Sequence, residues 1–232
     1  MFYFVGDIHG KFKGLVHWLK QRKIMDSKIV QVGDFGLGFT DRVKEINDLQ
    51  QLNKFLKITG NTMYSIRGNH DDPAYFDGKT THSNLIFLKD YSVLDIEDKT
   101  ILLAGGAISI DRTTRIEGKD YWKEEVFVFD TEKLAGVLAE TRKVDIVVTH
   151  NAPSEFWPYD LGKAVRTYAI QDINLIAELA KERDLHSKLL KYVTTKFSPS
   201  HWYYGHFHFT NQGEYSGMKY YALGEDEIRE HL

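Results

Sequence analysis

Five apolar runs in this chain are each followed, at once or after one residue, by a short polar group that contains aspartate, asparagine or histidine. The groups are Gly6-Asp7-Ile8-His9-Gly10, Gly33-Asp34-Phe35-Gly36, Gly68-Asn69-His70-Asp71, Thr149-His150-Asn151 and Gly205-His206-Phe207-His208. Taken singly, a Gly-Asp pair most often marks a turn, and a lone histidine most often packs in the core or lies at the surface. Five such groups, each at the end of a predicted buried strand, instead predict clustered oxygen and imidazole ligands. That arrangement is typical of two-metal sites that hydrolyse phosphate esters.

The first third of the chain alternates predicted strands and helices. Apolar residues at helical spacing predict helices at Phe12–Lys20 and Asp41–Lys57. Strands are expected at Phe2–Val5, Ile29–Val32 and Met63–Ile66. The order β-α-β-α-β favours a largely parallel sheet.

The rest of the chain has a different pattern. Short runs at Leu85–Leu88, Val93–Ile96 and Ile101–Ala104, with a turn at 97–99, predict an antiparallel addition. Further helices are expected from Asp130 or Thr131 to Leu138, at Gln171–Arg183 and at His186–Tyr192, and further strands at Val144–Val148, Trp202–Tyr204 and Met218–Leu223. Segment 111–129 fits no element and is expected to contain a functional loop. Because no linker-like stretch divides the chain, we predict one domain over residues 1–232.

Composition excludes some classes of chemistry. The chain has no cysteine, which rules out disulfides, thiolate metal sites and a cysteine nucleophile. Its net charge is −3 without a long basic run, so nucleic acid stays open as a substrate but is not indicated by charge. No stretch is long enough to cross a bilayer, and the apolar start is too short for a signal peptide. We expect a cytoplasmic protein without membrane association; the sequence indicates no oligomeric state.

The five groups, in this order, resemble the signature of the calcineurin-like metallophosphoesterases, in particular small bacterial and phage members. The resemblance runs from Asp7 to His208. It implies a four-layered α/β sandwich with two mixed β-sheets flanked by helices. It also implies hydrolysis of phosphomonoesters, phosphodiesters or both by a metal-bridged hydroxide. A protein or nucleotide phosphatase, a nuclease and a catalytically silent binding scaffold are the alternatives.

The same resemblance implies a role for each matching residue. One divalent ion would be held by Asp7, His9 and His208, and the other by Asn69, His150 and His206, with Asp34 bridging both. His70 would lie near the leaving group and protonate it, and Asp71 would orient His70. Hard oxygen ligands and imidazoles favour Mn²⁺, with Fe, Zn²⁺ or Ni²⁺ as alternatives.

Three arginines are candidates for binding the substrate phosphate. Arg67 stands where related protein phosphatases have a phosphate-contacting arginine; a surface salt bridge is the alternative. Arg112 and Arg115 follow a glycine-rich strand end, 105–106, that resembles a segment of small metallophosphoesterases; a β-bulge with solvated arginines is the alternative.

Two further features bear on the substrate. The second group continues Leu37-Gly38 and lacks the Val-Asp-Arg-Gly continuation of the Ser/Thr protein phosphatases, which argues against a protein phosphatase of that type. Trp157 and Tyr159 follow the group at His150 and are candidates for lining the mouth of a pocket, where they would either stack on a base or only pack.

Overall fold

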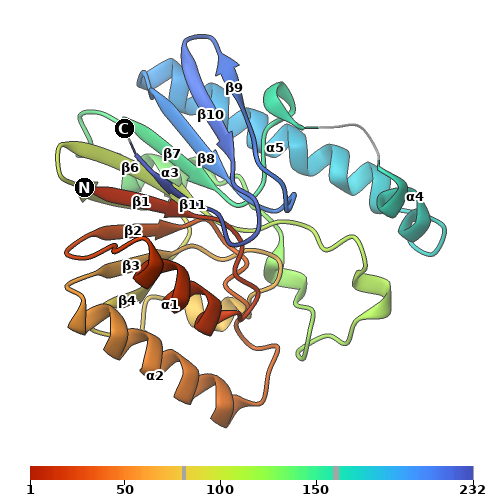
Figure 1. The fold of residues 1–232 in the computed structure, drawn as a ribbon. Coiled ribbons are helices and arrows are strands. Elements are labelled where there is room, and N and C mark those ends of the chain that lie inside the picture. The colour runs from red at the N-terminus through yellow and green to blue at the C-terminus, as the bar shows by residue number, and fades with distance from the viewer. Residues whose placement is uncertain (80–81, 159–161, 232) are drawn as a thin grey trace.

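A computed structural model describes residues 1–79, 82–158 and 162–231 and arranges them in four layers (Figure 1). Two β-sheets pack face to face, and each is covered by helices on its outer face. The first sheet is covered by α1 (Phe12–Gln21) and α2 (Arg42–Ile58), and the second by α3 (Thr131–Val137) and α5 (Leu175–Lys196). The predicted α/β sandwich with two mixed sheets is therefore confirmed.

The first sheet has the strand order β11-β1-β2-β3-β4. Its strands are β11 (Ile228–Glu230), β1 (Phe2–Val5), β2 (Lys28–Gln31), β3 (Thr62–Ser65) and β4 (Leu85–Phe87). The strands β1 to β4 are parallel, as the alternation of strands and helices predicts, and β11 pairs antiparallel with β1 at the edge.

The second sheet has the order β5-β6-β7-β8-β10-β9. Its strands are β5 (Ser92–Ile96), β6 (Lys99–Ala104), β7 (Ile146–Thr149), β8 (His201–Tyr204), β10 (Met218–Ala222) and β9 (Asn211–Tyr215). The central strands β6, β7, β8 and β10 are parallel, while β5 and β9 form antiparallel hairpins at the two edges.

Alternating side chains on the central strands fill two different cores, which explains why these strands read as nearly continuous apolar runs. Phe4 and Val30 point into the core between the two sheets, whereas Val5 and Ile29 point toward the helices α1 and α2. The ring of Phe4 stacks on Tyr203 of the second sheet, with the ring centroids 3.7 Å apart. The two sheets are thus joined by a dry core that fixes their strand ends relative to one another.

Two predictions about elements were wrong or incomplete. The run at Leu85–Leu88 does not join the antiparallel addition; it forms β4, parallel to β3 in the first sheet. The two helices predicted at Gln171–Arg183 and His186–Tyr192 are one continuous helix, α5. Its buried face includes the polar residues Glu182 and His186, which interrupt the apolar periodicity without interrupting the helix.

Some short elements carried no clear signal in the sequence. The helix α4 (Lys163–Ala169) and the strands β9 and β11 were not predicted, since each is short and largely exposed or intermediate in burial. Short 3₁₀ helices at Pro73–Phe76, Arg112–Thr114, Lys123–Glu125 and Ser154–Phe156 lie in the connections. No helix in the described part of the chain is long and apolar enough to cross a membrane.

Candidate metal centre

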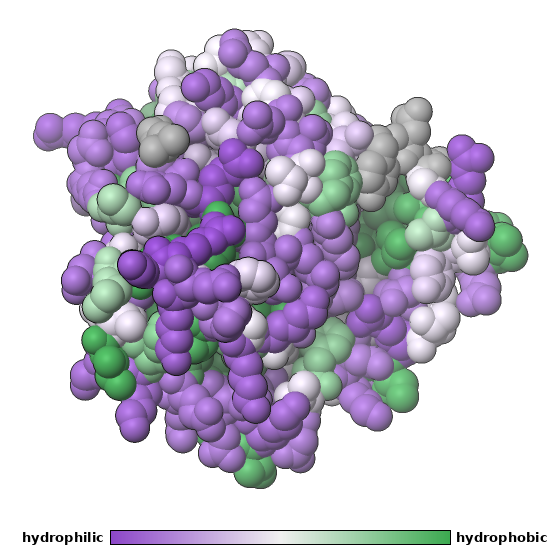
Figure 2. Space-filling model, in the orientation of Figure 1, coloured by the Kyte–Doolittle hydropathy of each residue, from purple (hydrophilic) through white to green (hydrophobic). Residues whose placement is uncertain are grey.

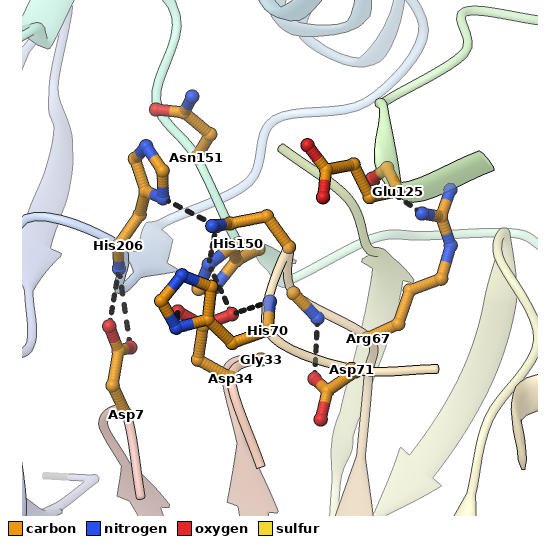
Figure 3. A network of polar contacts seen from close by, with 12 residues as sticks. Asp7, Gly33, Asp34, Arg67, His70, Asp71, Glu125, His150, Asn151 and His206 are labelled. Carbon is orange, nitrogen blue, oxygen red and sulfur yellow. Dashed lines mark hydrogen bonds and ion pairs between the residues drawn. The ribbon is translucent and has the colours of Figure 1, made fainter. Parts of the chain in front are cut away.

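The polar groups noted in the sequence follow the carboxyl ends of β1, β2, β3, β7 and β8. Because these strands are parallel within each sheet and the sheets pack face to face, the five loops meet at one edge of the sandwich. Figure 3 shows this meeting point, with Asp34 between Asp7 on one side and Arg67 and Asp71 on the other. All seven residues predicted as metal ligands lie here.

The first ligand group consists of Asp7, His9, Asp34 and His208. One ligand atom from each lies within 4.8 Å of every other. The Nε2 atoms of His9 and His208 are 3.0 Å apart, and His208 Nε2 lies 3.3 Å from Asp7 Oδ2. Two imidazoles and two carboxylates that converge in this way match the ligand chemistry of a divalent transition metal.

The second ligand group consists of Asn69, His150 and His206. The amide oxygen of Asn69 lies 3.2 Å from His150 Nε2 and 2.9 Å from His206 Nδ1. Asp34 stands between the two groups: its Oδ1 lies 3.2 Å from His150 Nε2, and its Oδ2 lies 3.8 Å from His9 Nε2. One carboxylate therefore turns an oxygen toward each group.

The backbone of the ligand residues is held in an uncommon conformation. His9, Asp34, His206 and His208 have φ angles of 49°, 57°, 69° and 56°. Non-glycine residues adopt this left-handed region rarely, and when they do so together at one place it points to a functional constraint. Here it turns the side chains of successive loop residues inward.

Two glycines make room for the carboxylates. A Cβ atom at Gly68 would lie 2.0 Å from Asp34 Oδ1, and one at Gly205 would lie 2.2 Å from Asp7 Oδ1. Any larger residue at either position would displace a ligand oxygen. The glycines in these two groups thus allow the close approach of one loop to the side chain of another.

Hydrogen bonds fix which atoms of His150 and Asn69 face the centre. His150 Nδ1 lies 2.9 Å from the carbonyl oxygen of Val32, so a proton on Nδ1 leaves Nε2 free to bind a metal. The amide nitrogen of Asn69 donates to Ser109 Oγ at 3.1 Å, and Ser109 Oγ donates to Glu125 Oε2 at 2.9 Å. With its nitrogen held in this way, Asn69 presents its oxygen to His150 and His206.

The electrostatics of the centre follow from burial and from the contact between Asp34 and the histidines. Burial opposes the charged form of Asp34, but the attraction of His150, His70 and His9 holds the pKa of Asp34 well below its usual range. Burial likewise opposes the charged form of His150, and Asp34 nevertheless raises the pKa of that imidazole. Burial lowers the pKa of His206, and the neighbouring His150 lowers it further. These shifts favour the ionised form of Asp34 and the neutral form of His206, the forms in which they bind metals, whereas the raised pKa of His150 means that its Nε2 must lose a proton before it binds one.

Asp71 lies at a different place from the one expected. Both of its oxygens accept hydrogen bonds from backbone N–H groups, so the side chain ties the Asp34 loop to the Asn69 loop instead of reaching His70. The donors are Phe35, Gly36, Leu37 and Gly68, at 2.7 to 3.1 Å. Burial and the nearby Asp34 charge raise the pKa of Asp71.

His70 and Arg115 form a pair beside the predicted metal ligands. His70 Nε2 lies 3.0 Å from Arg115 Nη2, and His70 Nδ1 lies 3.2 Å from His9 Nδ1. Arg115 is held by Asp111, with Nε to Oδ1 at 2.7 Å and Nη2 to Oδ2 at 2.8 Å. Burial lowers the pKa of His70 against the attraction of Asp34, and the Arg115 charge lowers it further. His70 thus faces the cavity with a cation at its outer nitrogen.

The other two candidate arginines are engaged elsewhere. Arg67 is buried, pairs with Asp90 at 2.7 Å and donates to three backbone carbonyls between Glu124 and Val126. Arg112 pairs with Asp172 at 2.6 Å and with Glu178 at 2.5 Å. Neither lines the cavity at the metal centre. Of the two alternatives for Arg67, the structure has the salt bridge. The pair with Asp90 is partly buried rather than at the surface.

Ser109, Glu125 and Gln31 were not singled out as site residues by the sequence analysis. Gln31 Oε1 accepts from the backbone N–H of Gly33 at 3.2 Å and from Ser65 Oγ at 2.5 Å, which fixes the strand ends that carry Asp34 and Asn69. The only local signal for Gln31 is a polar residue inside an apolar run. Glu125 lies in the segment that could not be assigned, so its buried contact with Ser109 had no signal in the sequence.

A cavity of about 340 Å³ opens at the metal centre. Its residues come from three of the ligand loops, from Trp157 and from the segments around Arg115, α4 and α5: Asp34, Asn69, His70, Ile110, Asp111, Arg115, Trp157, Val165, Tyr168, Leu179, Arg183, His206, Phe207 and His208. Trp157 lines the cavity as expected, whereas Tyr159 lies outside the described residues. A volume of this size lies at the lower end of the range for small-molecule sites.

Comparison with solved structures shows the same fold in other proteins. A candidate 5′-nucleotidase from Staphylococcus aureus shares 15% identity over 98% of this chain and 49% of its own, with a TM-score of 0.51. This chain therefore spans about half the length of that protein. A phosphopantetheinyl hydrolase from Mycobacterium tuberculosis (14% identity, 97% and 89% coverage, TM-score 0.47) and an archaeal phosphodiesterase (10%, 97% and 83%, 0.44) also match.

Comparison of the sequence itself gives a more specific result. None of the curated protein sequences compared with the chain matches it. The family model of the calcineurin-like phosphoesterases matches residues 1–209, a span that contains every residue of the two ligand groups. The chain belongs to the calcineurin-like phosphoesterase family.

Proposed function

We propose that the protein is a two-metal phosphoesterase that hydrolyses small phosphate esters. The observation that carries this proposal is the placement of Asp34, whose two oxygens face the two ligand groups at 3.2 and 3.8 Å. A carboxylate between two sets of ligands is what holds a pair of metal ions close together. Family membership and the adjoining cavity support the same reading.

The donor set fits divalent transition metals. It offers carboxylate and amide oxygens together with imidazole nitrogens and no thiolate, which favours Mn²⁺, with Fe, Zn²⁺ and Ni²⁺ as alternatives. The hydrogen bond from His150 to Val32 and the one from Asn69 to Ser109 direct the ligand atoms inward before any ion binds. Bound divalent ions would neutralise charge on the phosphoryl oxygens and lower the pKa of a water molecule.

The chain's own residues account for the remainder of the reaction. Hydrolysis forms a bond from a water oxygen to phosphorus and breaks the bond from phosphorus to the leaving oxygen, which must then gain a proton. His70 borders the cavity and is the group placed to deliver that proton once substrate displaces Arg115 from its Nε2 atom. Arg115, held by Asp111, is the guanidinium placed to bind phosphoryl oxygens.

The alternative functions have less support. A catalytically silent scaffold would be expected to lack one or more ligands, whereas all seven predicted ligand residues and His70 are present. A nuclease would be expected to track a nucleic-acid backbone with a basic groove, whereas the cavity here is lined in part by apolar side chains and the net charge is −3. A small-molecule phosphatase or phosphodiesterase fits the cavity better.

Metal removal tests the proposed function directly. We expect chelation followed by gel filtration to abolish hydrolysis of both a chromogenic monoester and a chromogenic diester, and Mn²⁺ to restore at least one activity. Elemental analysis before and after chelation measures the ions removed. Full turnover by protein that analysis finds to be free of metal would contradict the proposal.

His70→Ala tests proton delivery to the leaving group. For an alkyl phosphate, we expect kcat to fall roughly 10²–10⁴-fold, because the poor leaving group needs the proton. For a nitrophenyl phosphate the loss should be much smaller, and the metal content should be unchanged. His17→Ala, a histidine on α1 outside the cavity, serves as the control. Equal losses for the two substrates would mean that His70 acts in another way.

A comparison of Arg115→Ala with Arg112→Ala separates phosphate binding from structural ion pairing. Arg115 lines the cavity, so its removal should raise KM about tenfold or more for a phosphomonoester, with little change in metal content. Arg112 is paired with Asp172 and Glu178, so its removal should lower thermal stability and leave KM nearly unchanged. The assignment fails if the two KM values respond alike.

A further inference from the structure

The wall of the cavity away from the ligand groups is apolar. It is formed by a recess, named here the leaving-group recess, whose residues are Ile110, Trp157, Val165, Tyr168, Leu179 and Arg183. In Figure 2, apolar surface is visible in a hollow at the right of the molecule, where Figure 1 places α4 and the start of α5. A phosphate group has no apolar atoms to place against such a wall, so the recess is complementary to another part of the substrate.

The side chains that line the leaving-group recess are held in position by packing against the protein core, without a ligand. Ile110, Val165 and Tyr168 pack as partly buried residues against a small core that contains Leu175 and Leu179. Their buried faces hold them in position, while their remaining faces line the cavity. A preorganised wall loses little conformational entropy when a ligand binds.

Aromatic and cationic groups form the other side of the recess. The guanidinium of Arg183 lies over the indole ring of Trp157, 5.0 Å from its centroid, and Phe207 meets the same ring edge-on at 4.9 Å. Within residues 1–79, 82–158 and 162–231, no carboxylate lies at ion-pair distance from Arg183, unlike Arg115 with Asp111. The recess therefore offers aromatic surfaces together with the positive charge of Arg183.

We propose that the leaving-group recess binds an aromatic leaving group that is neutral or negatively charged. A flat ring finds aromatic contacts in Tyr168 and in Trp157, one face of which Arg183 covers, and apolar contact with Val165 and Leu179. The charge of Arg183 disfavours a cationic ring. This inference rests on the proposed function, because it takes the ligand groups as the site of the phosphate.

Non-hydrolysable ligands separate the recess from the chemistry. The affinities of phenylphosphonate and methylphosphonate for the full chain with Mn²⁺ added are measured by calorimetry. The carbon–phosphorus bond is not cleaved, so leaving-group reactivity does not enter. We expect phenylphosphonate to bind about tenfold more tightly or better, since burial of an aromatic ring is worth at least a factor of ten. A phenylphosphonate with a para-aminomethyl group should lose most of this gain.

Variants locate the effect. Tyr168→Ala and Val165→Ser should each reduce the preference for phenylphosphonate severalfold and leave the affinity for methylphosphonate unchanged. Ile170→Ala is the matched control, because Ile170 follows α4 but is exposed and does not line the cavity. Arg183→Gln should restore binding of the aminomethyl compound relative to phenylphosphonate.

The outcomes distinguish the two proposals. Equal affinity of the wild type for phenylphosphonate and methylphosphonate, or an undiminished preference in Tyr168→Ala and Val165→Ser, overturns the inference and leaves the proposed function standing. Equal binding of the aminomethyl compound and phenylphosphonate by the wild type overturns the role of Arg183. Failure of the Mn²⁺-loaded protein to bind either phosphonate removes both proposals.

Discussion

The negative charge of Asp34 lies almost completely out of contact with water, and the arrangement of the site depends on it. An isolated buried carboxylate would be too costly to keep ionised. Here Oδ1 accepts the backbone N–H of His70 at 2.7 Å, and the imidazoles of His150, His70 and His9 surround it. Loss of any one of these partners would leave part of the charge uncompensated.

The backbone around Asp34 explains how its side chain keeps this position. Its carbonyl oxygen accepts the N–H groups of Ile8 and His9, which joins the loop after β2 to the loop after β1. Asp71 joins the same loop to Gly68 through four N–H groups. The left-handed conformation of Asp34 is thus determined by contacts from both neighbouring loops, and the strain is supported by the surrounding structure.

The packing of the two sheets determines how the Asp34 loop lies relative to the other loops of the site. Asp34 and Asn69 come from the first sheet, whereas His150 and His206 come from the second. The core between the sheets, where Phe4 meets Tyr203, holds these sources in register together with hydrogen bonds such as the one from His150 to Val32. A binding site made across two sheets therefore depends on close packing far from the ligands.

The site residues that could be predicted from the sequence are marked by a local pattern, whereas those that were missed are defined by contacts between distant segments. Asp7, Asn69 and His150 each stand within three residues of the end of an apolar run, so a local pattern marks both the strand and the ligand at its end. The residues that hydrogen-bond to these side chains come from distant parts of the chain. Glu125 reaches Ser109 from a segment without regular periodicity, and Arg67 finds Asp90 across 23 positions. Such contacts leave no local pattern. For this reason the sequence could not decide whether Arg67 binds phosphate or forms a salt bridge.

The same distinction applies to the fold. Parallel pairing of β1, β2 and β3 follows from the spacing of strands and helices, whereas β11 forms because the chain's last described segment meets an open sheet edge. Helix α5 continues through Glu182, whose Oε2 accepts from Asn151 Nδ2, a partner 31 positions away that no local pattern indicates. Local periodicity therefore locates the elements that carry the ligands better than it locates the edges and long helices that support them.

The most direct test of the central role of Asp34 is the metal stoichiometry of Asp34→Asn, measured by elemental analysis after equilibration with Mn²⁺. The substitution keeps the size of the side chain but removes the charge that, under the proposed function, would offset two cations held close together. We expect at most one ion where the wild type binds two, and hydrolysis near background. Asn69→Ala should weaken one site and recover partly in excess Mn²⁺, and Asp41→Asn at the start of α2 should bind two ions normally. Two tightly bound ions in Asp34→Asn would contradict the account and place the bridge at another residue.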